Sequence, residues 1–264
     1  MQRYIKTNQE TSTTHLFWTG GFDSTYRLLE IVLEKRMPVQ PHYLIDSARL
    51  STRIEINTIR KIKQILFEKY PFTQQLILPT LFMETADLTP NEEIKIAFQE
   101  INKHSHLGTQ YDWLARYCHE KAIDEMGITA VLRYDGHIAT ILKNHVEKVE
   151  RYNFAVYRIK EDIYKLPEGI IFKYFLFPTY EKSKLELFQL AQEKGWGDMI
   201  NLTWFCHKPR AGDKPCGACE PCRQTINYGL GFRIPYQNRI MGKILHSVYD
   251  SKLFQTAKRA VKGR

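Results

Sequence analysis

Short apolar runs alternate along the chain with longer segments in which apolar residues recur at helical spacing. The short runs predict strands at residues 15–18, 42–46, 74–79, 128–133 and 169–177. The longer segments predict helices at residues 24–35, 53–70, 91–101, 109–126, 137–152 and 183–195. This alternation predicts an α/β fold with a doubly wound, mainly parallel sheet and helices on both of its faces.

The pattern changes near residue 200, which suggests two domains. Residues 1–200 form the predicted α/β domain, and residues 201–264 form a cysteine-rich region followed by a helical tail. In the tail, Met241, Ile244, Leu245 and Val248 recur at helical spacing among basic residues. We expect this amphipathic helix to dock on the body of the protein rather than on a membrane surface.

The positive charge of the chain lies almost entirely in this last region. Of 38 basic and 29 acidic residues, residues 206–264 hold 12 and 3, which leaves 26 of each sign before residue 206. Either the tail is a solvated basic segment, or it forms a surface for phosphate, nucleic acid or an acidic protein. No apolar run is long enough to span a membrane, and the polar first residues do not resemble a secretory signal. We therefore expect a cytoplasmic protein without a membrane partner.

A glycine-rich turn, "TGGFDST" at residues 19–25, follows the first predicted strand and opens the first predicted helix. Glycines let the backbone approach a ligand closely, and the first turn of a helix has unpaired N–H groups that suit an anion. Ser24 and Thr25 can add hydroxyl groups, and Asp23 can hold a divalent cation or cap the helix. From the residues alone, the stretch is either a phosphate-binding loop or a simple turn.

Four of the five cysteines, Cys206, Cys216, Cys219 and Cys222, lie within 17 residues. Thiolates at C-x2-C spacing can surround one tetrahedral Zn²⁺, and four of them leave no open position, so the predicted zinc site is structural. An iron–sulfur cluster is the competing occupant, and His207 could replace one ligand. Cys118 lies in a helical pattern and is predicted to be a core residue.

The turn resembles the SGGxDS[ST] loop of the PP-loop ATP pyrophosphatases, with Thr19 in place of the first serine. Together with the late cluster ending "CGACEPC", it resembles the 7-cyano-7-deazaguanine synthase (QueC) family over residues 15–230. The resemblance implies a HUP fold, like that of the adenine nucleotide α-hydrolases. It also implies ATP, Mg²⁺ and structural Zn²⁺ as cofactors, and cleavage of ATP between its α and β phosphates.

The resemblance also implies a set of site residues. The residues expected to hold ATP are Thr19, Gly20, Gly21, Phe22, Asp23, Ser24 and Thr25. "SKLELFQLA" resembles the lysine-bearing helix start of the family, which makes Lys184 a catalytic candidate in addition to Asp23, and Arg53 and Glu55 match an R-x-E-I segment of the family. Asp135 and His137, in "RYDGH", are candidates to orient the substrate or to take a proton, with Asp135 the favoured one.

Three stretches depart from the family. "HLGTQYDW" stands where the family has P-G-R-N, "ITAVLRYDGH" stands where the family strand reads I-T-G-V, and the segment from 138 to 169 is longer and more charged. The altered stretch at 106–113 and the strand at 128–133 with the "RYDGH" that ends it lie where we expect the substrate. The part of the site that activates ATP is therefore better matched than the part that receives the substrate.

The resemblance predicts a carbon–nitrogen ligase or synthase of queuosine biosynthesis. It would adenylate 7-carboxy-7-deazaguanine, a deazapurine, and use ammonia to form an amide and then a nitrile. One alternative is a diverged enzyme that joins a deazaguanine acyl group to a protein amine. Another is a tRNA-modifying enzyme whose basic tail holds nucleic acid. A homodimer is possible, and a binding module without activity is the least favoured reading.

Overall fold

The computed structural model describes residues 13–129 and 137–250, with the backbone only at residues 137 and 246–250. Five strands form one sheet in the order β3-β2-β1-β4-β7. They are β1 (Thr14–Phe17), β2 (Val39–Ile45), β3 (Leu81–Glu84), β4 (Met126–Gly127) and β7 (Phe175–Leu176). All four neighbouring pairs are parallel, so the predicted α/β fold with a mainly parallel sheet is confirmed.

The strand order places β1 at the centre of the sheet. The chain runs outward from β1 to β2 and β3, and then returns to the other side of β1 for β4 and β7. The connection after β1 therefore leads to one side of β1, and the connection after β3 leads to the other side. In sheets of this kind, ligands bind beyond the carboxyl ends of the strands at the point where the strand order reverses.

Alternate residues of β1 serve two separate cores. Leu16 and the following Trp18 are fully buried in one apolar cluster, whereas Phe17 belongs to the other. This period of two is the geometry of a strand whose faces are both covered, and it explains why "HLFW" is a continuous apolar run.

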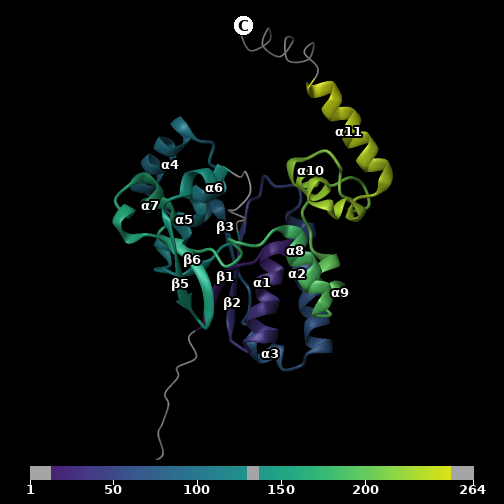
Figure 1. Cartoon of the computed structure of the whole chain (residues 1–264), viewed down its shortest axis with the longest axis horizontal. Helices are drawn as coiled ribbons and strands as arrows, with labels where there is room; N and C mark the ends of the chain where they lie inside the picture. The colour runs from purple at the N-terminus through teal and green to yellow at the C-terminus, as the bar shows by residue number, and fades with distance from the viewer. Residues whose placement is uncertain (1–12, 130–136, 251–264) are drawn as a thin grey trace, which may run out of the picture.

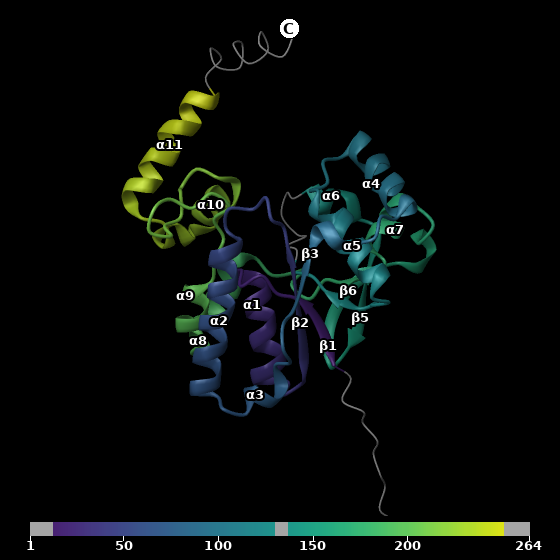
Figure 2. The ribbon, with the colours of Figure 1, turned by 180° about the vertical axis from the view of Figure 1, so that it is seen from behind.

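Helices cover both faces of the sheet (Figures 1 and 2). One face carries α1 (Phe22–Leu29), its π-helical continuation η1 (Glu30–Glu34), α2 (Thr52–Lys69), α8 (Lys184–Glu193) and α9 (Gly197–Leu202). The other carries α4 (Glu92–His104), α5 (Gln110–Glu120), α6 (His137–Leu142) and α7 (Pro167–Phe172). Short connecting turns are α3 (Thr73–Leu76), η2 (Thr85–Asp87) and η3 (Glu161–Ile163).

The prediction of a helix at 137–152 is wrong beyond Leu142, where α6 ends. Its second half is β5 (Val146–Arg151), which pairs with β6 (Phe154–Ile159) in an antiparallel hairpin. Tyr152 and Asn153 form the two-residue turn, and both have positive φ angles, 53° and 60°. A tight hairpin turn of this type needs that conformation, and no helix can continue through it.

Three further boundaries differ from the prediction. The strand predicted at 74–79 contains α3, and the third strand is β3, which starts at residue 81. The helix predicted at 109–126 ends at Glu120, and β4 occupies 126–127; residues 130–133 of the next predicted strand lie outside the described residues. The apolar run at 169–177 begins in α7 and becomes β7 only at Phe175. A Cβ on Gly169 would collide with the backbone of Ile163, so the glycine allows α7 to pack closely there.

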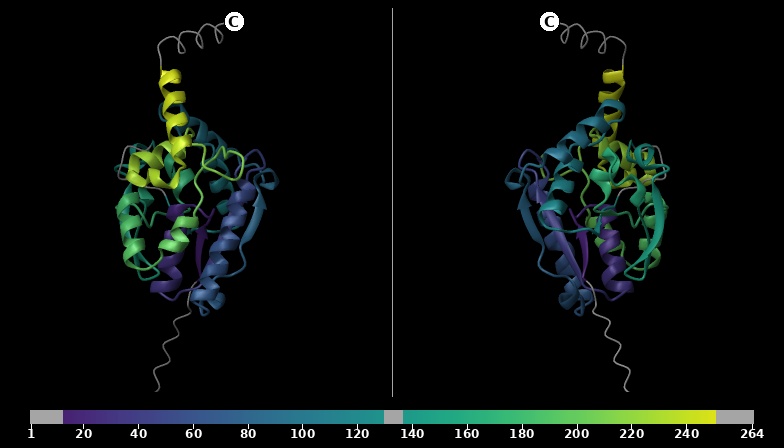
Figure 3. Two further views of the ribbon diagram at one scale, coloured as in Figure 1. Left: turned by 90° about the vertical axis from the view of Figure 1, so that its right-hand side faces the viewer. Right: turned by 90° about the vertical axis from the view of Figure 1, so that its left-hand side faces the viewer.

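The C-terminal region contains α10 (Glu220–Thr225), η4 (Ile226–Leu230), η5 (Gly231–Arg233) and α11 (Tyr236–Asp250). The predicted tail helix is therefore present, but it docks on the cysteine-rich loop and projects away from the sheet (Figure 3). None of the described helices is both long and apolar enough to cross a membrane.

Candidate functional site

A cavity of about 360 Å³ lies beyond the carboxyl ends of β1 and β2. Its wall is built from the turn after β1, the end of β2, the first turn of α5 and the start of α8. The cysteine-rich region closes the remaining side through residues 204–207 and the start of α10. The cavity therefore occupies the position where a sheet of this strand order binds its ligands.

The glycine turn supplies backbone donors to this cavity. Helix α1 makes its first hydrogen bond from the Thr25 N–H to the Gly21 carbonyl, at 3.0 Å. The N–H groups of Phe22, Asp23 and Ser24 therefore have no partner within the helix, and no side chain caps its start. These three residues line the cavity together with Thr19 and Gly21, so five of the seven predicted ATP residues face it.

The other two predicted residues lie behind the turn and do not line the cavity. Gly20 has a φ of +69°, and a Cβ there would lie 3.1 Å from the Thr58 side chain and 3.2 Å from the Glu55 carbonyl of α2. Thr25 is fully buried and accepts a hydrogen bond of 2.9 Å from the Trp18 indole. Both residues hold the shape of the turn against its surroundings.

Asp23 and Lys184, each named separately as a catalytic candidate, meet at the edge of the cavity. The Lys184 ammonium lies 3.2 Å from Asp23 Oδ2, and 23% and 16% of the two side chains are exposed. The other oxygen, Oδ1 of Asp23, is buried and has no hydrogen-bond partner among the described residues. A buried carboxylate oxygen without a partner is suited to a cation.

Two features hold Lys184 and a further cation near the turn. Ser183 and Glu186 form a capping box that starts α8 at Lys184. Arg233 is partly buried and donates to the Thr203 carbonyl at 2.6 Å. Burial lowers the pKa of Arg233 to about 10, and the nearby Asp23 carboxylate opposes that shift. Lys184 and Arg233 therefore both lie near the Asp23 carboxylate.

The two residues of the R-x-E-I match take different positions. Glu55 is buried, lines the cavity, and accepts hydrogen bonds from Tyr43 Oη at 2.8 Å and Ser51 Oγ at 2.6 Å. Arg53 points away from the cavity and pairs with Asp213 of the cysteine-rich loop at 2.6 Å, so its contact is structural. Arg49, which the sequence reading did not single out, lines the cavity and lies 3.7 Å from Glu55.

An aromatic wall faces the glycine turn. The rings of Phe17, Tyr111, Trp113, Trp204 and Phe205 line the cavity. Tyr111 and Trp113 belong to "HLGTQYDW", and Ile128 and Thr129 belong to "ITAVLRYDGH", so two of the three stretches that depart from the family contribute to the cavity. The sequence reading missed Trp204 and Phe205, for which proximity to the cysteine cluster was the available signal. Asp135 lies outside the described residues, and only the backbone of His137 is described.

A buried histidine pair, also missed from sequence, adjoins the cavity. His42 lines it and is 1% exposed. Its ring nitrogens lie 2.9 Å from His15 Nδ1 and 2.7 Å from Tyr117 Oη. Burial, followed by the influence of His15, lowers the pKa of His42 to about 4, so the imidazole is neutral near pH 7.

The four clustered cysteines converge on one point. Their sulfur atoms all lie within 4.8 Å of one another. Cys216 Sγ and Cys222 Sγ are 3.9 Å apart, and Cys219 Sγ and Cys206 Sγ are 3.8 Å apart. Sulfur atoms bonded to tetrahedral zinc at about 2.3 Å lie about 3.8 Å from each other. The cluster can therefore hold a metal ion such as zinc.

The backbone around the cluster also fits thiolate ligands. N–H groups of Cys216, Ala218 and Cys219 point to the sulfurs of Cys206 and Cys216 at 3.2 to 3.4 Å. Such bonds stabilise ligand thiolates in metal sites. Hydrogen bonds from Cys206 and then Cys222 lower the pKa of Cys219. Cys118 lies elsewhere, fully buried in α5, and is a core residue as predicted.

The cysteine-rich region is joined directly to the glycine turn. The Trp204 N–H donates to the Gly20 carbonyl at 2.9 Å, and the Trp204 indole donates to the Cys206 carbonyl at 2.7 Å. One tryptophan therefore connects the turn to the first metal-ligating residue. A metal ion in the cluster would fix this wall of the cavity.

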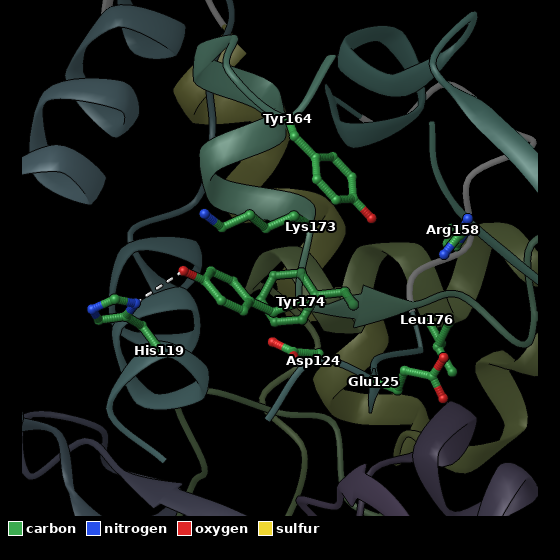
Figure 4. A pocket seen from close by; sticks show the side chains of 9 residues that line it. His119, Asp124, Glu125, Arg158, Tyr164, Lys173, Tyr174 and Leu176 are labelled. Carbon is green, nitrogen blue, oxygen red and sulfur yellow. Dashed lines mark hydrogen bonds between the residues drawn. The ribbon is translucent and has the colours of Figure 1, made fainter. Parts of the chain in front are cut away.

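A second cavity, of about 510 Å³, lies at the amino ends of β4 and β7 (Figure 4). Two of its charged side chains pair with neighbouring elements, Glu125 with Arg151 at 2.6 Å and Arg158 with Glu147 at 2.9 Å, whereas Asp124 and Lys173 have no ion-pair partner among the described residues. The Tyr174 hydroxyl points to His119 Nδ1 at 3.2 Å. None of the long helices of the described residues starts at this cavity, so we place the functional site at the glycine turn.

No protein-family model matches the chain, and no curated protein matches it either. The assignment of a function therefore depends on the geometry and the chemistry of the cavity.

Proposed function

We propose that this protein is an ATP-dependent enzyme that activates a carboxylate by adenylation, as the PP-loop ATP pyrophosphatases do. The observation that supports this best is the glycine turn. It follows the central strand at the point where the strand order reverses. Its N–H groups that have no partner within helix α1 line the same cavity as the Lys184–Asp23 pair. Such a helix start binds phosphate through its backbone donors and its dipole.

The residues of the turn have separable roles in this proposal. The N–H groups of residues 22–24 hold the phosphates, and Lys184 neutralises the charge that develops on the leaving pyrophosphate. The buried Oδ1 of Asp23 is the atom best suited to hold Mg²⁺. Magnesium would supply further charge neutralisation at the phosphates. The turn and the strand order are also those expected for a HUP fold.

The aromatic wall suggests the chemistry of the substrate. Tyr111, Trp113 and Trp204 offer flat apolar surfaces to a planar heterocycle, such as 7-carboxy-7-deazaguanine. Attack of the carboxylate oxygen on the α-phosphorus forms an acyl-adenylate and releases pyrophosphate. Attack of ammonia on the acyl carbon then forms the C–N bond, and AMP and one proton leave. The product at this stage is an amide, which a nitrile synthase would dehydrate.

One observation favours a second acceptor. A stretch that departs from the family, around Tyr111 and Trp113, lines the same cavity as the ATP loop. A changed acceptor wall fits an enzyme that transfers the same acyl group to a different amine, such as an amine of a protein. The basic tail leaves transfer to tRNA as a further alternative.

The test is to incubate purified protein with ATP, Mg²⁺ and 7-carboxy-7-deazaguanine, with and without ammonium, and to measure AMP, pyrophosphate and products by mass spectrometry. We expect AMP formation that depends on the carboxylate, together with amide or nitrile when ammonium is present. AMP without either product would favour another amine acceptor. Absence of AMP with every carboxylate and acceptor tried would overturn the proposal.

A nucleotide-binding measurement separates failure of the substrate assignment from failure of the site assignment. We expect ATP with Mg²⁺ to raise the melting temperature of the wild-type protein, and the Asp23→Asn variant to lose most of that shift. An equal shift in both proteins would place the nucleotide elsewhere.

A further inference from the structure

The turn cavity contains one acidic side chain besides Asp23. Of the described residues that line it, only Asp23 and Glu55 are acidic, and Asp23 is paired with Lys184. The Glu55 side chain is 7% exposed, so its carboxylate is buried in the cavity wall. Burying a carboxylate is costly unless hydrogen bonds satisfy its oxygen atoms. The partners of Glu55 therefore indicate what it can still accept from a ligand.

Each carboxylate oxygen of Glu55 has one hydrogen-bond donor among the described residues. Tyr43 Oη donates to Oε2 at 2.8 Å, and Ser51 Oγ donates to Oε1 at 2.6 Å. Burial, followed by the charge of Glu55, raises the pKa of Tyr43, so this hydroxyl keeps the proton that it donates. An ionised carboxylate can accept about four hydrogen bonds. The two hydroxyl groups therefore fix the orientation of the carboxylate and leave it room for about two further donors.

Arg49 places N–H donors next to this carboxylate. Its Nη1 atom lies 3.7 Å from Glu55 Oε1, which is too long for a direct hydrogen bond, and 24% of the side chain is exposed. Arg49 and Glu55 line the same cavity, so both can reach a ligand bound there. The wall therefore offers a donor and an acceptor group side by side.

A flat aromatic surface adjoins the Arg49–Glu55 pair. A Cβ on Gly20 would lie 3.2 Å from the Glu55 carbonyl, and the Trp204 N–H donates to the Gly20 carbonyl at 2.9 Å. Glu55 and Trp204 therefore both contact Gly20, and both line the cavity. A planar ring packed on the Trp204 indole would lie near the charged pair.

We propose that Arg49 and Glu55 recognise the edge of the heterocycle that the enzyme adenylates. A 7-deazaguanine has a carbonyl oxygen at C6 followed by two N–H donors, on N1 and on the 2-amino group. Arg49 donates to the carbonyl oxygen, and Glu55 accepts from the two donors, as basic and acidic side chains do when they read bases. This inference rests on the proposed function, from which it takes the substrate, and it adds the residues that select among heterocycles.

The arrangement determines which analogues bind weakly. A 6-amino group in place of the carbonyl, as in a 7-deazaadenine, directs N–H groups at Arg49, and loss of the 2-amino group removes one donor to Glu55. Polar groups of a site that lose their partners make such a site selective. We expect the 6-amino analogue of 7-carboxy-7-deazaguanine to bind about a hundredfold more weakly, and the analogue without the 2-amino group about tenfold more weakly.

The experiment is isothermal titration calorimetry of the full chain with these three carboxylates. Mg²⁺ and an ATP analogue with a methylene group between the α and β phosphorus atoms are present, because that analogue cannot be cleaved there. Glu55→Gln should lower the affinity for 7-carboxy-7-deazaguanine by about tenfold or more, because an amide has one acceptor oxygen and turns N–H donors towards the donors of the base. Arg49→Met should remove most of the preference over the 6-amino analogue.

The matched control is Arg53→Met. This arginine lies four residues further along the chain and pairs with Asp213 outside the cavity, so its replacement should leave the affinity and the preference unchanged. Circular dichroism checks the folding of each variant, and the rise in melting temperature with ATP checks its nucleotide site.

Three results would overturn the inference. One is a wild-type protein that binds the three carboxylates equally well. Another is an Arg49→Met protein with the same affinities as Arg53→Met. The third is a folded Glu55→Gln protein that loses the melting-temperature shift with ATP, because the carboxylate would then bind the nucleotide.

Failure of the proposed function gives a different result. Binding with the expected preferences, but without AMP formation, would overturn the adenylation and leave the recognition of the base in place. AMP formation from another carboxylate, without binding of 7-carboxy-7-deazaguanine, would overturn the recognition and leave the adenylation in place.

Discussion

The two cavities lie at opposite ends of the same parallel sheet, and the larger one is the weaker functional candidate. The cavity at the amino ends of β4 and β7 has a volume of about 510 Å³, against about 360 Å³ at the glycine turn. In the larger cavity, Glu125 and Arg158 pair with Arg151 and Glu147, and no lining side-chain atom of the described residues is buried without a hydrogen-bond partner. At the glycine turn, three backbone N–H groups have no partner within helix α1, and Oδ1 of Asp23 is buried without a partner among the described residues.

This difference suggests that polar groups without partners are a better sign of a candidate ligand site than the volume of a cavity. Burying a polar group without a partner costs about 1–3 kcal/mol, so a fold tends to retain one where something else satisfies it. The direction of the strands explains which end has such groups. Helices that follow parallel strands begin at the carboxyl edge, and their first N–H groups point there.

The largest expected effect comes from removing one cysteine of the cluster that could hold a metal ion beside the turn cavity. Structural zinc contributes on the order of 10 kcal/mol of binding free energy. Cys222→Ser should abolish stoichiometric zinc binding, expose the region from Trp204 to Ile234 to proteases, and weaken ATP binding. Cys118→Ser is the matched control and should keep the metal. Elemental analysis, limited proteolysis and nucleotide titration measure these effects. A Cys222→Ser protein with normal ATP affinity would show that the wall does not need its metal.

The second prediction compares the effects of replacing one lysine in each cavity. Lys184→Met should lower the rate of AMP formation by about 10²–10³-fold, because a charge next to the leaving pyrophosphate is lost. Lys173→Met, in the cavity of Figure 4, removes the same charge at the other end of the sheet and should leave the rate unchanged. Steady-state kinetics of the two variants decide the point. Equal losses would remove the functional distinction between the cavities.

A pH effect should arise at His42, beside the turn cavity. Its pKa is lowered to about 4 in the folded protein, against about 6.5 in an unfolded chain. The unfolded state therefore binds more protons between these pH values, so the stabilisation is complete above pH 6.5 and is lost as the pH falls towards 4. The loss should reach up to about 3 kcal/mol.

Urea unfolding at several pH values measures this slope. In His42→Asn the dependence over that range should be smaller than in the wild type. His119→Asn alters an exposed histidine of the second cavity and should keep the wild-type slope. A slope unaffected by His42→Asn would mean that other groups carry the acid sensitivity.

The smallest effect isolates the packing of the glycine turn. Gly20→Ala and Gly195→Ala both place a Cβ at a positive φ, +69° and +71°. Each should lose about 1–2 kcal/mol from backbone strain. Only Gly20 has neighbours within 3.4 Å of the added Cβ, so its variant should lose about 1 kcal/mol more. Thermal or chemical unfolding of the two variants gives the difference in their free energies of unfolding. Equal losses would show that α2 can move away from the added Cβ without destabilising the protein.

The sequence by itself determined the parts of this protein that depend on local chemistry. The alternation of apolar runs predicted the parallel α/β sheet, and the spacing of Cys206, Cys216, Cys219 and Cys222 predicted a metal-binding cluster. Phe22, Asp23 and Ser24, which line the cavity, were candidates from sequence because a strand–glycine–helix junction leaves N–H donors without partners within the helix.

Only the tertiary structure decided the features that depend on distant partners. The segment at 146–159 has a residue pattern that fits a helix or a strand. In the structure it is a hairpin, with its turn at Tyr152 and Asn153. Gly20 and Thr25 look like ligand residues in the sequence, yet Gly20 packs against α2 and Thr25 accepts a hydrogen bond from Trp18. The aromatic wall joins residues from β1, α5 and the cysteine-rich loop. No short sequence window contains that wall, because the chain assembles it only when parallel strands bring their carboxyl ends to one edge of the sheet.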